Sequence, residues 1–210
     1  MSQAEQNDAD NNLDDNVNSS LNNTFDNDDS LAVLDISAAD SIDDDILESF
    51  YNRENLLKVM MATLDNIDER IKNGLTLPYY ADIDTEVWQE KSKALDIYIT
   101  DAVEGQELNL EARGKDYATN ILSYPSYLPA AIIGLMPTLP LGELVICHGV
   151  VVREAAEQNK TVNQHISHLL IHGVLHLLGF DHELGQAEQD EMESFEIDIL
   201  AGLALPNPYL

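Results

Sequence analysis

The sequence has little cysteine, few basic residues and no long apolar run. Cys147 is the only cysteine among 210 residues, so the chain cannot form an internal disulfide or build a Cys-rich zinc ribbon or finger. This scarcity of cysteine indicates a reducing compartment. The longest charge-poor stretch, 127–142, is interrupted by three prolines, whereas a bilayer span needs about 20 apolar residues in a helix. We therefore expect no membrane partner, and any metal site must use histidines and carboxylates.

Lys and Arg number only 10 against 39 Asp and Glu, which gives a formal net charge of −29. The long-range field of such a chain repels a phosphate backbone, so composition alone argues against nucleic-acid binding, and no DNA partner is expected. Residues 1–30 contain no Lys or Arg and few apolar residues, which predicts a disordered acidic tail, or else a helix that forms only on docking. The first residues do not resemble a secretory signal, so we expect a cytoplasmic protein.

Apolar periodicity divides the rest of the chain, 31–210, into the strands and helices of one domain. Short or alternating apolar runs predict strands at 31–36, 94–100, 120–124 and 143–147. Apolar residues repeating at three and four predict helices at 45–73, 102–112, 150–159, 161–178 and 186–201. The segments 75–90 and 125–141 are predicted to be loops. Because strands and helices are mixed without strict alternation, the sequence predicts an α+β fold.

All six histidines lie between 148 and 182, and three of them have a metal-ligand spacing. His172 and His176 are four residues apart, so on a helix both imidazoles face the same point. Gly179 can end that helix in the left-handed conformation and turn His182 back to the same point. Three neutral nitrogen ligands suit Zn²⁺ and leave a fourth position open, as in catalytic zinc sites. We therefore predict a zinc site on His172, His176 and His182.

The other three histidines, His148, His165 and His168, are predicted not to bind the metal. Of these, His168 precedes His172 by four residues, so on a helix it lies on the same face as the ligand pair. A fourth protein ligand would close the site and make the metal structural, and Asp181 and His168 are the nearest candidates for that role.

A helix-borne histidine pair followed by glycine and a third histidine is also found in zincin metalloproteases. Those enzymes carry a glutamate directly after the first histidine, where it acts as the general base. Here that position is Gly173. A protease would need its base elsewhere, and Asp181 and Glu183, which flank the third histidine, are better suited to orient that ligand. Proteolysis is therefore the least favoured alternative.

Arg113 and Lys115 lie in a glycine-containing turn between a predicted helix and a predicted strand. A planar guanidinium binds phosphate oxygens in bidentate fashion and can neutralise the charge of a phosphorane-like transition state. Arg113 is thus the candidate catalytic residue, and Arg113 and Lys115 are candidate substrate-binding residues. The alternative is a surface ion pair of Arg113 with Glu111 or Asp116.

Several motifs, in the expected order, resemble the YbeY family of bacterial endoribonucleases, also called rRNA maturation factors. The resemblance covers about 94–210 and is carried by Asn109, Arg113-Gly-Lys-Asp116, Thr119-Asn-Ile-Leu-Ser-Tyr-Pro125, Leu141-Gly-Glu-Leu-Val-Ile146, Arg153-Glu-Ala155, the histidine segment 172–182 and Pro206-Asn-Pro208.

The resemblance implies a single α+β zincin-like domain, with a small mixed β-sheet packed with helices and a central helix that carries two of the ligands. It implies a zinc ion on His172, His176 and His182, and cleavage of single-stranded RNA in which Arg113 helps. It further implies work on the 3′ end of small-subunit rRNA and in ribosome quality control, with the small ribosomal subunit and assembly factors as partners.

The sequence departs from the family pattern in its acidic tail, in an insertion at about 74–92, in Asn120 where Asp is more usual, and in its charge. These departures leave open a second reading, a ribosome-assembly binding factor with a structural metal. Much of the acidic surplus lies in residues 1–48, which contain no Lys or Arg. RNA would then contact the metal, Arg113 and Lys115 in a cleft whose local electrostatic potential differs in sign from the net charge of the chain. We therefore expect the salt dependence of RNA binding to be weak or absent.

Overall fold

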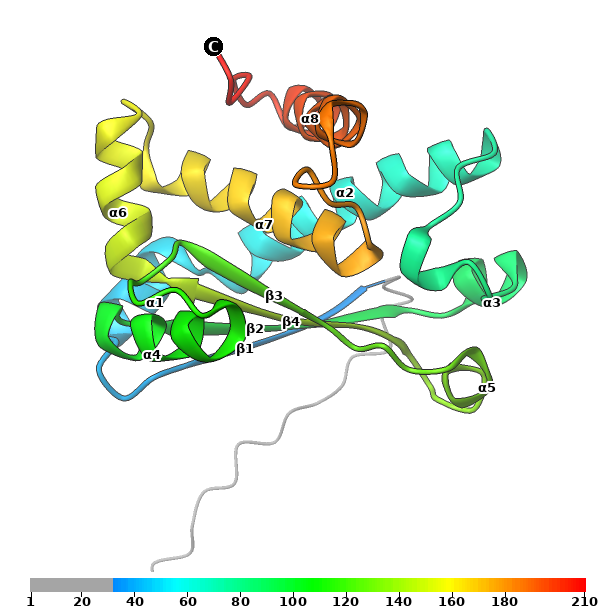
Figure 1. The fold of residues 1–210 in the computed structure, drawn as a ribbon, viewed down its shortest axis with the longest axis horizontal. Helices are drawn as coiled ribbons and strands as arrows, with labels where there is room; N and C mark the ends of the chain where they lie inside the picture. Colours follow the sequence, from blue (N-terminus) through cyan, green and yellow to red (C-terminus); the bar gives the residue numbers. More distant parts are fainter. Residues whose placement is uncertain (1–31) are drawn as a thin grey trace, which may run out of the picture.

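The computed structural model describes residues 32–210 and has an α+β architecture (Figure 1). Its four strands are β1 (Ala32–Ala38), β2 (Lys93–Thr100), β3 (Ile121–Pro125) and β4 (Leu139–Cys147). The helices before β3 are α1 (Asp44–Phe50), α2 (Arg53–Lys72), the 3₁₀ helix η1 (Pro78–Tyr80), α3 (Thr85–Glu90) and α4 (Ala102–Arg113). After β3 come α5 (Ala130–Ile133), α6 (His148–Glu157), α7 (Val162–Leu178) and α8 (Gln186–Gly202). The predicted α+β class is confirmed, and the predicted tail, 1–30, lies outside the described residues.

The strands form one mixed sheet in the order β1-β2-β4-β3. β1 and β2 pair in parallel, as do β2 and β4, whereas β3 runs antiparallel to β4 and forms an edge of the sheet. Helices α2 and α7 cover one face, with α8 stacked outside them, and α4 lies against the other face (Figure 1). Residues buried on the inner side of β2 alternate with more exposed ones, because successive side chains of a strand point to opposite faces.

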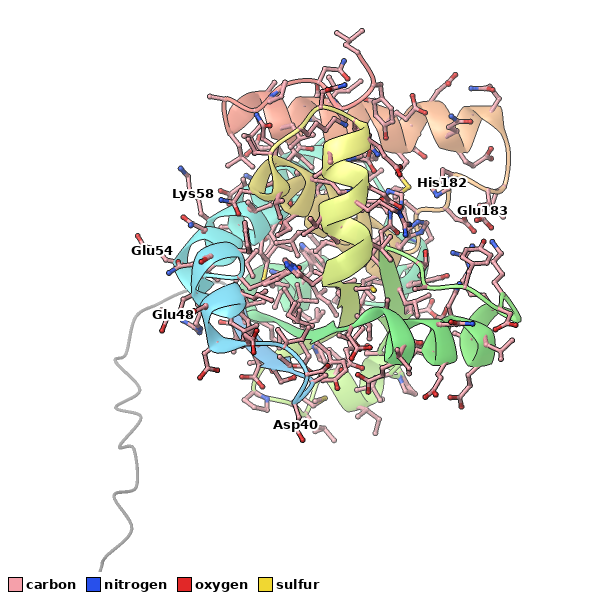
Figure 2. All side chains as sticks on the ribbon, turned by 90° about the vertical axis from the view of Figure 1, so that its left-hand side faces the viewer. Asp40, Glu48, Glu54, Lys58, His182 and Glu183 are labelled. Atoms are coloured by element: carbon pink, nitrogen blue, oxygen red, sulfur yellow. The ribbon has the colours of Figure 1, made fainter. Side chains whose placement is uncertain are left out.

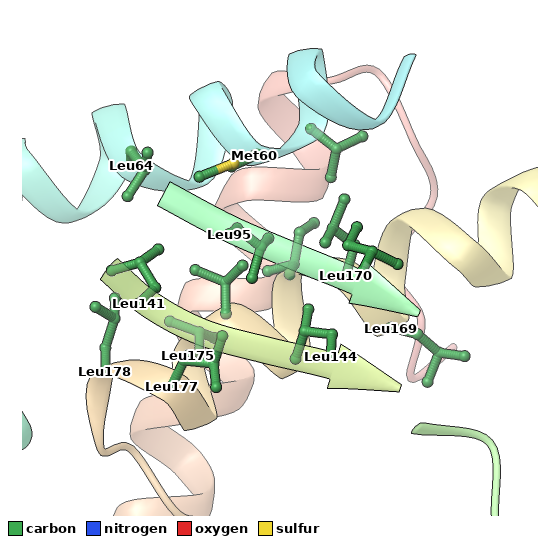
Figure 3. Close-up of a cluster of buried hydrophobic side chains, with 14 of the residues drawn as sticks. Met60, Leu64, Leu95, Leu141, Leu144, Leu169, Leu170, Leu175, Leu177 and Leu178 are labelled. Atoms are coloured by element: carbon green, nitrogen blue, oxygen red, sulfur yellow. The ribbon is translucent and has the colours of Figure 1, made fainter. Parts of the chain in front are cut away.

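The core lies between the sheet and helices α2 and α7. Buried leucines and Met60 from α2, β2, β4 and α7 meet there (Figure 3). The apolar stripe of α7 is wide, since Leu170, Leu175 and Leu178 are all fully buried. α7 is therefore the central helix of the domain, and the position of its histidines is fixed by the packing of its opposite face. None of the helices in residues 32–210 is long and apolar enough to cross a membrane.

Several predicted element boundaries are wrong. The predicted helix 45–73 is interrupted at Asn52, whose side chain accepts hydrogen bonds from the amides of Glu54 (3.0 Å) and Asn55 (3.2 Å) and so starts a new helix. The predicted loop 75–90 contains η1 and α3, and the predicted loop 125–141 contains α5. The strand predicted at 143–147 begins at Leu139, because a register shift opposite Ala94 and Leu95 of β2 accommodates one extra residue, Leu141, between Pro140 and Gly142 of β4.

Candidate metal centre and RNA-binding cleft

Helix α7 carries His172 and His176 on one face, and specific capping interactions define both of its ends. At its start, Thr161 and Gln164 form a capping box, in which each side chain accepts a hydrogen bond from the other residue's backbone amide. At its end, Gly179 adopts a left-handed conformation with φ of 98°. The chain reverses there, so His182 faces the two helical histidines.

The three predicted ligand histidines meet. Their ring centroids are 4.5 Å apart for His172 and His176, and 5.2 and 5.3 Å from each of these to His182. One nitrogen from each ring lies within 4.8 Å of the other two. Two nitrogens bound at 2.0–2.1 Å to a tetrahedral ion are about 3.3 Å apart, and the Nε2 atoms of His172 and His176 are 3.1 Å apart. The donor set therefore fits a zinc ion. Within residues 32–210, no fourth His, Cys, Asp or Glu joins this cluster.

Burial keeps His176 neutral, which is the state a metal ligand requires. Loss of hydration, together with the neighbouring His172 and His182, lowers the pKa of His176 to about 4. The nitrogen lone pair of His176 is therefore free at neutral pH.

Glu196, on α8, orients His172 and is a site residue that the sequence did not reveal. Its fully buried carboxylate accepts hydrogen bonds from His172 Nδ1 (2.8 Å), from His168 Nε2 (3.0 Å) and from the Tyr209 hydroxyl. Burial would raise the pKa of Glu196, but the hydrogen bonds from His168 and His172 outweigh it and lower that pKa to about 2. The ionised carboxylate fixes the proton of His172 on Nδ1 and leaves Nε2 facing the cluster.

The three other histidines have partners elsewhere in the described structure. His148 Nδ1 lies 3.1 Å from the Tyr51 hydroxyl, and His165 Nε2 lies 3.0 Å from Glu154. His168 Nε2 lies 3.0 Å from Glu196, and the His168 ring packs edge-on against the His172 ring, but none of its nitrogens belongs to the cluster of ligand atoms. All three are thus placed outside the metal-ligand set.

A cleft of about 580 Å³ opens beside the histidines and runs along the edge strand β3. His172, His176 and His182 line it together with the residues of β3. One face of the histidine cluster is therefore open to a substrate-sized space, as in a catalytic rather than a structural metal site.

Arg113 lines the same cleft, at the C-terminal end of α4. Its guanidinium pairs with Glu183, at 2.7 Å between Nη2 and Oε1, and not with Glu111 or Asp116. His182 and Glu183 lie next to each other in the loop between α7 and α8, far from the acidic residues Glu48 and Glu54 of α1 and α2 (Figure 2). The pair therefore brings Arg113 to the third histidine across 70 residues of sequence.

Lys115 is exposed and is not one of the described residues that line this cleft. Asp181, which the sequence places beside the third ligand, accepts a hydrogen bond from the backbone amide of Glu183 (2.8 Å). Asp181 and Glu183 thus shape the loop and hold Arg113.

The steric surroundings of Gly173 exclude the general base of the zincin proteases. A Cβ atom at this position would lie 2.7 Å from a methyl carbon of Leu144 and 2.9 Å from one of Ile121. Gly173 lets α7 approach the sheet closely, so a glutamate side chain has no room there. The face of α7 next to the first ligand histidine points into the core rather than into the cleft.

Asn120 forms part of a partly buried polar network at the start of β3. Its Nδ2 donates to Glu154 Oε2 (2.9 Å), which also lies 3.0 Å from His165 Nε2, and its Oδ1 accepts from the amide of Ile121 (2.7 Å). An aspartate here would set a second carboxylate against Glu154. The amide at this position is therefore matched to its neighbours and anchors the strand that borders the cleft.

Comparison with known proteins agrees with this arrangement. The family model of Endoribonuclease YbeY matches residues 52–204. A protein of Psychrobacter arcticus named Endoribonuclease YbeY is 76% identical over 209 residues, covering 100% of both chains. A Psychrobacter cryohalolentis protein of the same name is 80% identical over 154 residues, which are 73% of this chain and 99% of that protein. An Acinetobacter baumannii protein of this name is 52% identical over 113 residues, or 54% of this chain and 72% of that protein. The chain belongs to the YbeY family of endoribonucleases.

Proposed function

We propose that this chain is a zinc-dependent endoribonuclease that cleaves single-stranded RNA, and that it acts on the 3′ end of small-subunit rRNA and in ribosome quality control. Family membership supports RNA cleavage. The observation that carries the proposal is the cluster of three histidines with one face open to a cleft that Arg113 also lines. The small ribosomal subunit and its assembly factors are the proposed partners, and the cytoplasm is the proposed location.

His172, His176 and His182 would hold the zinc ion. Bound there, zinc supplies Lewis acidity toward a phosphodiester oxygen. The chain's own contribution is to keep His176 neutral and to orient His172. Burial keeps His176 neutral, and the Glu196 carboxylate orients His172.

Arg113 would bind the phosphate that is cleaved. Its pair with Glu183 is partly exposed, with 38% and 58% of the two side chains accessible. Exposed ion pairs contribute only about 0–1 kcal/mol, so a phosphate can replace Glu183 as the partner of the guanidinium at little cost. A bidentate contact then neutralises charge that develops on the phosphate oxygens. Lys115, in the exposed turn that follows, would contact a phosphate farther along the strand.

The two alternatives lack a supporting observation. A structural metal site would require a fourth protein ligand, and within residues 32–210 the candidates Asp181 and His168 are engaged by the Glu183 amide and by Glu196. A protease would require a carboxylate base beside the first histidine, where Gly173 abuts Leu144.

The test is an Arg113→Ala substitution with Arg153→Ala as its matched control. Arg153 is an exposed arginine on α6 that pairs weakly with Glu157, at 3.8 Å, and does not line the cleft. Arg113→Ala should leave zinc bound but slow cleavage of a single-stranded RNA by about 10²–10³-fold, the usual cost of removing one charge-stabilising donor. Arg153→Ala should cleave at the wild-type rate. Equal cleavage rates for the two variants would show that Arg113 is only a surface ion-pair residue.

A further inference from the structure

Two tyrosines at the mouth of the cleft take no part in the chemistry described above. Tyr79, from η1, and Tyr127, from the loop after β3, both line the cleft together with the three histidines. Their ring centroids are 5.1 Å apart at an interplanar angle of 58°. The two residues are 46% and 69% exposed, so neither ring is needed to fill the core. An exposed aromatic pair that faces a binding cleft indicates a ligand that covers it.

The backbone at Tyr127 is strained. Its φ of 48° lies in the left-handed region, which a bulky side chain rarely adopts. The preceding residue, Ser126, holds the loop in place: its hydroxyl donates to the Pro140 carbonyl (2.8 Å) and its amide donates to the Leu141 carbonyl (3.1 Å). Such strain persists where the surroundings impose it and is concentrated at ligand-binding sites.

Tyr79 is fixed relative to the histidine cluster through Gly179. A Cβ atom at Gly179 would lie 2.9 Å from the Tyr79 ring, so the absence of that atom allows the ring to pack against the end of α7. Gly179 is also the residue that turns the chain toward His182. The aromatic pair and the three histidines therefore have a defined relative position.

We propose that Tyr79 and Tyr127 form a stacking platform for an unpaired base of single-stranded RNA, next to the phosphate that Arg113 holds. This inference rests on the proposed function and adds to it a base-binding subsite. Bases of any identity stack on aromatic rings, so the platform fits single strands without strict sequence preference.

The charge of the cleft explains why stacking matters in this chain. Arg113 is the one Lys or Arg among its described lining residues, and Asp181 and Glu183 lie beside it. Binding through phosphates alone would be opposed by these carboxylates and by the net charge of −29. Stacking is neutral, so it supplies affinity that the electrostatics of this surface cannot.

The experiment measures Kd and cleavage kinetics of zinc-loaded full-length protein with a short single-stranded RNA. Tyr79→Ala and Tyr127→Ala should each raise Kd and KM by about 5–150-fold with little change in kcat, which is the range for loss of one stacked base. Tyr79→Phe and Tyr127→Phe keep the ring and should bind like the wild type. Tyr117→Ala, which removes an exposed tyrosine that does not line the cleft, is the matched control and should also bind like the wild type.

Two further measurements separate stacking from a structural role. An RNA with one abasic position at the stacked base should bind the wild type as weakly as intact RNA binds Tyr127→Ala, and that variant should lose nothing more on the abasic RNA. Tyr127→Gly relieves the left-handed backbone, so its Tm should be no lower than that of the wild type while its RNA affinity falls. Wild-type affinity and KM in both alanine variants would overturn the platform and leave the proposed function standing. Absence of cleavage by zinc-loaded wild type would instead refute the proposed function, and the Kd comparison would still decide on the platform.

Discussion

Glu196→Gln is the substitution that best probes how the chain prepares its metal centre. The carboxylate of Glu196 is fully buried and accepts hydrogen bonds from three donors, His172 Nδ1, His168 Nε2 and the Tyr209 hydroxyl. A glutamine has the same shape but only one acceptor oxygen, and its NH₂ group must face one of these donors. In the variant, His172 would be less firmly oriented and its ligand nitrogen less basic.

The expected loss of zinc affinity follows from the hydrogen bond that this carboxylate accepts from the ligand His172. Removing a hydrogen-bond acceptor behind a metal-bound histidine typically weakens metal binding by about 10–100-fold. This corresponds to about 1.4–2.7 kcal/mol of zinc-binding free energy. Because the hydrogen bonds from His168 and His172 lower the pKa of Glu196 to about 2, the carboxylate is ionised at neutral pH and the full effect should be present there.

The assay is competition for zinc between the protein and a chromophoric chelator at neutral pH, with urea unfolding of the metal-free proteins as a check on folding. Glu191→Gln is the control, since it makes the same charge change at an exposed position of the same helix and should bind zinc like the wild type. Equal zinc affinity of Glu196→Gln and wild type would refute the reasoning that Glu196 prepares His172.

Three other outcomes follow from the structure. Gly179→Ala should lower the free energy of unfolding in urea by about 1–3 kcal/mol, because it places a Cβ atom against the Tyr79 ring at a φ of 98°, and an unchanged value would contradict that steric argument. Asn120→Asp should lower the free energy of unfolding by about 1–3 kcal/mol at neutral pH. The pKa of Glu154 is lowered by hydrogen bonds from His165 and Asn120, and a second carboxylate would oppose this ionisation. The deficit should therefore shrink as the pH falls and one carboxyl takes up a proton, whereas a pH-independent deficit would exclude charge repulsion as its cause. Finally, the slope of log K for RNA binding against log of salt concentration should stay shallow, between about −0.7 and −1.4 for the one or two phosphates that Arg113 and Lys115 neutralise, and a steeper slope would show that more cations take part.

The sequence was sufficient for the histidine cluster because its determinants are local. The interval of four residues from His172 to His176 places both on one helix face, and Thr161 and Gly179 mark the two ends of that helix. The α+β class was predictable for the same reason, since periodicity within each segment reports its own secondary structure.

Contacts between distant segments could not be read from the sequence. Glu196 lies on α8 among several acidic residues, and only packing against α7 shows that this carboxylate is the buried one. The partner of Arg113 is Glu183, not a neighbour in its own turn, because the loop after α7 folds back onto α4. Apolar periodicity continues across Asn52, so only the capping hydrogen bonds reveal that a new helix begins there.

The central claim is that three imidazoles hold a zinc ion that RNA cleavage requires. The most direct measurement is the zinc content of purified protein together with its cleavage of a single-stranded RNA, for wild type beside His182→Ala. We predict one equivalent of zinc and cleavage for the wild type, and loss of both in the variant, which lacks one of three ligands that lie within 4.8 Å of each other. Undiminished cleavage by metal-free protein, or full zinc content in His182→Ala, would contradict the account.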